Sequence, residues 1–211
     1  MTQLDELRKQ LYTDVGVRML EYGFKAKSAS RSYVKSFDGG KGSFHLTYTN
    51  HPGIDFDVSA NVAVRVDAVE EILTEDDHRL TEKEKKDCYT IGINIGNLVL
   101  GSYLQLTVTT DADLEPVATK LMEFVPTVVV PYIEKNRDLE AMYDLLTPAD
   151  PKRRWDHRPG RTHRARTLLA LSVLLGRADT NDLIDRLREE IQPEHQSQIE
   201  WFEGLVRRLG F

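Results

Sequence analysis

The sequence predicts an α+β fold: an antiparallel sheet of about five strands packed by N- and C-terminal helices, followed by a small three-helix C-terminal unit. Two changes of hydrophobic period along the chain support this. Apolar residues recur at helical spacing over the first 19 residues. They alternate with polar residues between residues 33 and 108, and the helical spacing returns from residue 114. We therefore expect strands in the middle of the chain and helices on both sides of them.

The first element is an amphipathic helix. Its apolar positions are Leu4, Leu7, Leu11, Val15 and Met19. This is the spacing of one helical face. The helix is expected to end at Gly23, because glycine readily adopts the left-handed conformation after a helix, and Phe24 should fold back on the last turn.

A hairpin and a long strand follow. Tyr33 and Phe37 flank a short strand, residues 39–42 supply a glycine-rich turn, and apolar residues alternate again from Phe44 to Tyr48. After the turn at residues 51–53 comes the clearest strand. One face of it carries Phe56, Val58, Ala60, Val62, Val64 and Val66. The other face carries Asp55, Asp57, Ser59, Asn61 and Arg65, and we expect it to be solvated.

The rest of the sheet and the following helices are less regular. Residues 67–87 are strongly charged and predict a short helix and a loop, whereas residues 89–95 and 104–108 alternate like strands. A helix from Leu114 is expected to break or kink at Pro126. One further helix is predicted over residues 132–146.

Proline and glycine mark a linker near residue 150. Pro148, Pro151, Pro159 and Gly160 favour a linker over residues 148–160. Beyond it, three helices are predicted, at about 162–175, at 183–191 before Pro193, and at 199–209. The first is apolar almost all round and should be buried. The predicted organisation is an α+β domain at 1–147, a linker at 148–160 and a helical unit at 161–211.

Composition limits the class of protein. Cys88 is the single cysteine, so neither an intramolecular disulfide nor a cysteine-based zinc site is expected. The N-terminus is polar from its second residue, and no run approaches the roughly 18 apolar residues of a membrane span. We therefore expect a cytoplasmic protein without a membrane partner.

Charge is unevenly distributed. Residues 1–151 hold 16 Lys or Arg against 25 Asp or Glu, and residues 152–211 hold 12 against 9. Residues 152–166 alone hold seven basic residues. The candidate partner-binding residues are Arg153, Arg154, Trp155, Arg158, Arg161, Arg164 and Arg166. The arginines at the start of a helix are mildly unfavourable, because the N-terminal end of the helix dipole is positive, so something should compensate them.

Three partners for these arginines stay open. The first and favoured one is internal, an acidic cluster formed by Glu70, Glu71, Glu75, Asp76 and Asp77. The second is an acidic protein partner. The third is nucleic acid, with stacking by Trp155 and His157 and phosphate contacts from the arginines. The acidic balance of the whole chain and the lack of a nucleic-acid-binding motif weigh against the third.

No motif assembles a catalytic set. The glycines at 39–42 lack phosphate-loop spacing and precede a strand, and no two histidines have the i, i+4 spacing of a metal site. Asp55 and Asp57 share a strand face and are candidates for acid and base chemistry, although two solvated carboxylates are the simpler interpretation. Cys88 is expected to be a small buried hydrophobe. We predict no cofactor and no metal.

Several segments resemble one bacterial family. They are Gly23-Phe24-Lys25, the strand at Tyr33, the strands at Phe44 and at 56–66, Cys88 to Leu98 with its Ile95-Gly-Asn-Leu98 turn, and Val130-Pro-Tyr-Ile133. Together they look like the bacterial domain of unknown function 4304 (DUF4304) family over about residues 4–147. The resemblance implies a bacterial, intracellular setting and gives no catalytic residues to carry over. By analogy, it implies an immunity- or defence-associated binding protein.

The sequence therefore predicts a non-enzymatic intracellular protein-interaction module. The first alternative is a nucleic-acid-associated protein that uses the basic stretch 152–166. The second alternative is an enzyme whose site lies on the polar face of the sheet.

Overall fold

A computed structural model describes residues 3–75, 77–148, 157–158 and 160–211. Contacts divide the chain into two compact units, each formed from two segments. Unit 1 consists of Met1–Val64 and Gly92–Lys135, and unit 2 of Arg65–Ile91 and Asn136–Phe211. The predicted organisation, 1–147, 148–160 and 161–211, differs from this division, because residues 65–91 pack with the C-terminal helices. Most of the predicted linker lies outside the described residues.

Unit 1 begins with the predicted helix. Helix α1 spans Gln3–Met19 and buries Leu7, Leu11, Val15 and Met19. A 3₁₀ turn at Leu20–Tyr22 follows and ends at Gly23, whose φ of 79° is left-handed and whose N–H donates to the Leu20 carbonyl. Phe24 N donates to the Met19 carbonyl over 3.2 Å. The predicted end of the helix at Gly23 is confirmed.

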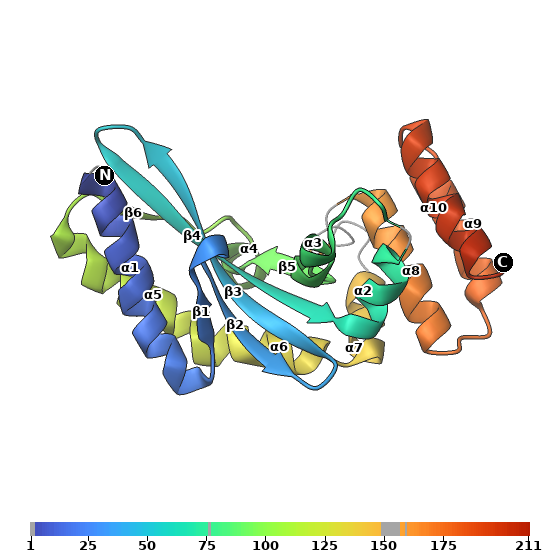
Figure 1. The fold of residues 1–211 in the computed structure, drawn as a ribbon, viewed down its shortest axis with the longest axis horizontal. Helices are drawn as coiled ribbons and strands as arrows, with labels where there is room; N and C mark the ends of the chain where they lie inside the picture. The colour runs from blue at the N-terminus through green and yellow to red at the C-terminus, as the bar shows by residue number, and fades with distance from the viewer. Residues whose placement is uncertain (1–2, 76, 149–156, 159) are drawn as a thin grey trace. The chain divides into compact units, whose positions relative to one another are not determined.

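Within the described residues the sheet has six strands. Figure 1 labels each of them. They are β1 (Lys25–Lys27), β2 (Ser32–Phe37), β3 (Gly40–His51), β4 (Asp55–Val66), β5 (Ile91–Asn94) and β6 (Leu106–Val108). The order is β1-β2-β3-β4-β5, and β6 pairs with β4. The pairs β1–β2, β2–β3 and β4–β6 are antiparallel. The predicted α+β fold with an antiparallel sheet and helices at both ends of the chain is confirmed.

Strand β4 buries one face as predicted. Its apolar positions from Phe56 to Val66 are at most 7% exposed. The opposite face is not uniformly solvated, because Ser59 and Arg65 are only 4% and 7% exposed. The Ser59 hydroxyl lies 2.7 Å from the Tyr103 hydroxyl. Arg65 donates to Asp67 and to the carbonyls of Lys85 and Cys88. Each of these polar side chains has hydrogen-bond partners, which offset the cost of its burial.

The second half of unit 1 is more helical than predicted. Helix α4 (Ile95–Leu100) begins at Ile95, which was predicted to be in a strand, because the Asn94 side chain accepts a hydrogen bond from Gly96 N over 2.9 Å and starts the helix. A 3₁₀ turn (Asp111–Asp113) leads into α5 (Leu114–Phe124). The chain stays helical through a π-helical turn (Val125–Val129) into α6 (Val130–Asn136). The α-helix is thus interrupted at the position of Pro126, where a break or kink was predicted, and the chain continues as a π-helical segment.

The described part of unit 2 is mainly helical. Its helices are α2 (Asp67–Thr74), α3 (Glu82–Asp87), α7 (Leu139–Leu146), α8 (Arg161–Leu174), α9 (Thr180–Ile191) and α10 (Gln196–Arg208). The single helix predicted at 132–146 is wrong, because Asp138 caps the start of α7, accepting from Ala141 N over 2.9 Å. Helix α8 is buried almost all round, as predicted, and packs against α2, α7, α9 and α10. Among the described residues, no helix is long and apolar enough to cross a bilayer.

Candidate functional site

The predicted partner-binding arginines have different surroundings. Arg153, Arg154 and Trp155 lie outside the described residues. Arg161 is partly exposed, and its Nη1 lies 3.5 Å from a Glu194 carboxylate oxygen. Arg164 and Arg166 are buried in unit 2, and Arg158 is partly buried there.

Arg164 is a structural residue. It is 3% exposed. Its Nε donates to the Leu146 carbonyl over 2.9 Å, and its Nη1 forms an ion pair with Glu190. A buried charge paired in this way joins helices α7, α8 and α9.

Arg166 fixes a tryptophan. Its Nη1 donates to the Trp201 carbonyl over 2.6 Å and its Nη2 to the Leu73 carbonyl over 2.8 Å. Its guanidinium carbon lies 3.9 Å from the centre of the Trp201 ring. Burial, aided by the charge of Arg208, lowers the Arg166 pKa to about 10. The residue thereby links α2, α8 and α10.

Arg158 and Glu70 each bury a polar atom without a partner. Arg158 Nη1 donates to the Tyr89 carbonyl over 2.7 Å, but its buried Nε has no hydrogen-bond partner in the described part of the chain. Glu70 is 1% exposed, and its Oε1 likewise lacks a partner there. Burial lowers the pKa of Arg158, and the negative charge of Glu70 partly opposes this shift. The two charges thus act on one another, although the described residues show no direct ion pair between these two side chains.

Both residues line one pocket of about 470 Å³, the Glu70–Arg158 pocket. Its size falls within the range of about 300–1,000 Å³ for small-molecule sites. All of its lining residues belong to unit 2. They are Glu70, Leu73, Thr74, Asp77, Arg79, Leu80, Cys88, Tyr89, Arg158, His163, Arg166 and Trp201.

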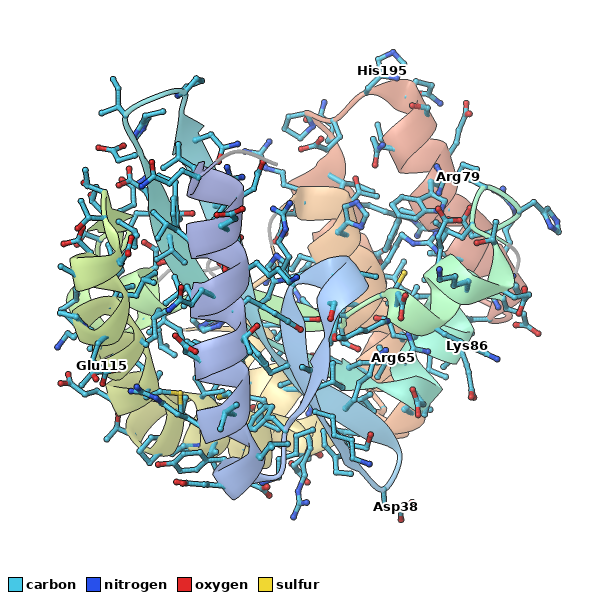
Figure 2. The ribbon with its side chains drawn as sticks, turned by 60° about the vertical axis from the view of Figure 1, so that its left-hand side comes forward. Asp38, Arg65, Arg79, Lys86, Glu115 and His195 are labelled. Carbon is cyan, nitrogen blue, oxygen red and sulfur yellow. The ribbon has the colours of Figure 1, made fainter. Side chains whose placement is uncertain are left out.

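Trp201 forms a fixed wall of this pocket. Arg79, labelled in Figure 2, comes from the loop after α2 and lies 4.8 Å from the centre of the indole ring. His163 meets the ring edge-on at 4.9 Å. Arg79 also holds Asp77 through hydrogen bonds of 2.6 and 2.8 Å, which lower the Asp77 pKa. Burial, followed by the charges of Arg158 and Arg166, lowers the His163 pKa, so the imidazole favours its neutral form.

The predicted acidic cluster is divided among several roles. Glu70 and Asp77 line the pocket, where their charges act on Arg158 and Arg166, respectively. Glu75 forms an ion pair with Arg208 of α10 instead. Glu71 is exposed, and Asp76 lies outside the described residues.

The other sequence candidates form no catalytic set. The Cys88 thiol follows α3 rather than opening a strand, and it donates to the Glu84 carbonyl at 3.3 Å. Burial, followed by the charge of Glu70, raises its pKa. Asp55 and Asp57 lie on either side of His51, at 2.5 and 3.8 Å from its ring nitrogens, near the exposed end of the β3–β4 hairpin. The described residues contain no group of three or more His, Cys, Asp or Glu placed to hold a metal ion.

Comparison with known proteins adds no assignment, since no family model, curated protein or solved structure matches the chain. The sequence analysis named Glu70, Arg158 and Arg166 but not Trp201 or Arg79. One signal pointed to Trp201: it stands one position before Phe202, beside the apolar stripe of its helix rather than on it. A large aromatic residue there needs another partner, and Arg166 provides it.

Proposed function

We propose that the protein is a non-enzymatic binding protein of the cytoplasm, and that its ligand enters the Glu70–Arg158 pocket. The observation that carries the proposal is the pair of buried atoms, Glu70 Oε1 and Arg158 Nε, without partners among the described residues. Leaving one such group unpaired costs about 1–3 kcal/mol. A ligand or an ordered water that bonds to both atoms removes this cost.

The titratable groups of the pocket favour binding over catalysis. A nucleophilic cysteine needs a lowered pKa or a base within hydrogen-bond reach. The pKa of Cys88 is raised instead, and its thiol donates to a backbone carbonyl. His163 packs edge-on against Trp201. These contacts support a site that holds a molecule without transforming it.

A protein partner, which the sequence predicted first, is the second candidate here. In unit 1, Val99, Leu100 and Tyr103 are 47%, 59% and 52% exposed, and they follow one another on α4 and the loop after it. Exposed apolar residues that gather in this way favour a protein contact. The bacterial, defence-associated setting implied by the DUF4304 resemblance stays a prediction. Leu100→Lys should abolish such a contact without unfolding the chain, which size-exclusion chromatography of the isolated complex would detect.

The nucleic-acid alternative has less support. Arg164 and Arg166 direct their hydrogen-bond donors to carbonyls and a carboxylate of unit 2. Donors used in this way are withdrawn from phosphate contacts.

The test of the pocket is recovery of a bound molecule from the protein's own cells. We would purify the tagged chain with and without nuclease and examine it by native mass spectrometry, beside Arg158→Met in the pocket and Arg161→Met outside it. The proposal expects a stoichiometric, nuclease-resistant ligand in the wild type and in Arg161→Met that is lost in Arg158→Met. Equal recovery from both variants, or nuclease-sensitive material lost from both, would contradict it.

A further inference from the structure

We infer that the Glu70–Arg158 pocket binds a small zwitterion with the chemistry of a free α-amino acid, an ammonium group beside a carboxylate, carried on an apolar or aromatic side chain. This inference rests on the proposed function and specifies its ligand. It follows from the two unpartnered atoms, from the charges of Glu70 and Arg158, and from the other residues that line the pocket.

The two unpartnered atoms need opposite kinds of hydrogen-bond partner. Glu70 Oε1 is an acceptor and needs a donor, whereas Arg158 Nε is a donor and needs an acceptor. An ammonium group donates to a carboxylate, and a carboxylate accepts from a guanidinium. One molecule that carries both groups on the same carbon atom, as an α-amino acid does, can serve both residues.

The charges of Glu70 and Arg158 favour a zwitterion over a simple ion. A plain anion at Arg158 would also meet the negative charge of Glu70, and a plain cation at Glu70 would also meet Arg158, because these two residues already interact electrostatically. A zwitterion gives alternating charges: carboxylate, ammonium, carboxylate, guanidinium. Every neighbouring pair in this row is attractive, and charge-assisted hydrogen bonds are about twice as strong as neutral ones. A neutral amide or hydroxyl would satisfy the geometry with weaker bonds.

The remaining lining suits an apolar side chain. Leu73, Leu80, Tyr89 and Trp201 border the same pocket. The Trp201 ring is held by Arg166 at 3.9 Å and by Arg79 at 4.8 Å, so it forms a wall that is already in place before binding. A pocket of about 470 Å³ has room for an amino acid as large as leucine or phenylalanine.

The first arm of the test uses wild-type protein and altered ligands. L-Leucine and L-phenylalanine would be titrated calorimetrically, beside L-leucinamide, which lacks the carboxylate, and N-acetyl-L-leucine, which lacks the ammonium group. We expect each analogue to bind about ten- to a hundred-fold more weakly than leucine, because each loses one charged hydrogen bond. Analogues that bind as tightly as leucine, or neither amino acid binding at about 10 mM, would overturn the inference.

The second arm uses matched variants. Glu70→Gln removes the buried carboxylate charge, and Glu71→Gln makes the same change at the exposed neighbour on α2. Leucine affinity should fall about tenfold or more in the first variant and stay unchanged in the second. Equal affinity in both would contradict the inference. Circular dichroism and thermal unfolding would show whether each variant is folded.

A third readout needs no substitution. Cys88, the single cysteine of the chain, lines the pocket. Bound leucine should slow alkylation of its thiol by iodoacetamide in proportion to occupancy, and leucinamide at the same concentration should not. Equal alkylation rates with and without leucine would contradict binding in this pocket even if Glu70→Gln fails to fold.

The two proposals fail in different ways. If Arg158→Met loses a cellular ligand that proves not to be zwitterionic, the inferred chemistry is wrong and the binding function stands. If the wild type carries no cellular ligand and no amino acid binds, both are wrong.

Discussion

The two units bury polar groups in different ways. In unit 1, Tyr33 is fully buried, and its hydroxyl donates to the Tyr12 carbonyl over 2.7 Å, while the Tyr12 hydroxyl donates to the Ser32 carbonyl over 3.1 Å. In unit 2 the buried polar groups include charges, with Glu70, Arg164 and Arg166 between 1% and 5% exposed. A neutral hydroxyl needs one good bond, whereas a buried charge needs an opposite charge or several bonds. Among the described residues, unit 1 therefore leaves a neutral hydroxyl, that of Tyr48, without a partner, whereas unit 2 also leaves atoms of two charged side chains, Glu70 and Arg158, without partners.

Unit 2 itself contains two different arginine–glutamate pairs. Arg164 and Glu190 are in direct contact, and Arg164 also donates to a backbone carbonyl. Arg158 and Glu70 interact at longer range, and each has a buried atom without a partner among the described residues. The first pair stabilises the helices, and the second leaves room for a ligand. Four predictions test this comparison.

Removing Arg164 from its ion pair with Glu190 should have the largest effect on stability. Arg164→Met leaves Glu190 without its partner and removes the bond to Leu146, and we expect a loss of about 3–5 kcal/mol in the free energy of unfolding of unit 2. Urea denaturation followed by amide hydrogen exchange would measure it. Arg161→Met, which removes a partly exposed ion pair, should cost less than about 1 kcal/mol. Equal losses in the two variants would show that Arg164 is not structural.

In unit 1 the strongest constraint is steric. A Cβ on Gly96 would lie 2.2 Å from the backbone nitrogen of Leu104 and 2.5 Å from the Ser102 carbonyl oxygen. Gly96→Ala should therefore destabilise unit 1 by about 1–3 kcal/mol. Gly204→Ala in α10, where a Cβ meets nothing within 4 Å, should instead stabilise unit 2 by about 0.5–1 kcal/mol. Thermal unfolding of both variants checks this, and a stable Gly96→Ala protein would contradict the packing around α4.

The buried tyrosines should make unit 1 sensitive to alkali. Burial raises the pKa of Tyr33, Tyr48 and Tyr132 above the ordinary value of 10.0. The unfolded chain therefore loses these protons first, and stability falls as the pH rises above 10. Tyr132→Phe should reduce the slope of unfolding free energy against pH between 9 and about 11.5. An unchanged slope would mean that this hydroxyl is not buried.

The smallest effect is expected in the stability of unit 2 at acidic pH. The His163 pKa lies below its ordinary value of 6.5, so the unfolded chain binds a proton more readily. The stability contributed by neutral His163 is complete above pH 6.5 and is lost as the pH falls through the lowered pKa. Trp201 fluorescence of a Trp155→Phe protein would report this change. A His163→Gln variant with the same pH profile would contradict it.

Local sequence patterns predicted most of the elements. Strict alternation marked β4, and helical spacing marked α1, α8, α9 and α10. Competing local chemistry caused the errors, such as the Asn94 cap that starts a helix at Ile95 and the Asp138 cap that divides the helix predicted at 132–146. The division into units was not predicted, because α2 packs against α8 from far away in the sequence.

The sequence indicated some residues of the site but not how they are arranged. Glu70 belonged to a predicted acidic cluster and Arg158 to a predicted basic stretch, and the favoured hypothesis brought the two groups together. Their arrangement depends on contacts such as that between Arg166 and the Leu73 carbonyl, 93 positions apart, which no local period reveals. For the same reason, the sequence did not show that Arg164 is structural while Arg158 has an unpartnered Nε.

The most direct measurement is the electron density between Glu70 and Arg158 in crystals of the protein purified from its own cells. We predict density for a bound molecule with a donor at Glu70 Oε1 and an acceptor at Arg158 Nε, bordered by Trp201. A single ordered water bridging the two atoms, or a direct ion pair between the two side chains, would show that the pocket is satisfied without a ligand and would contradict the proposed function.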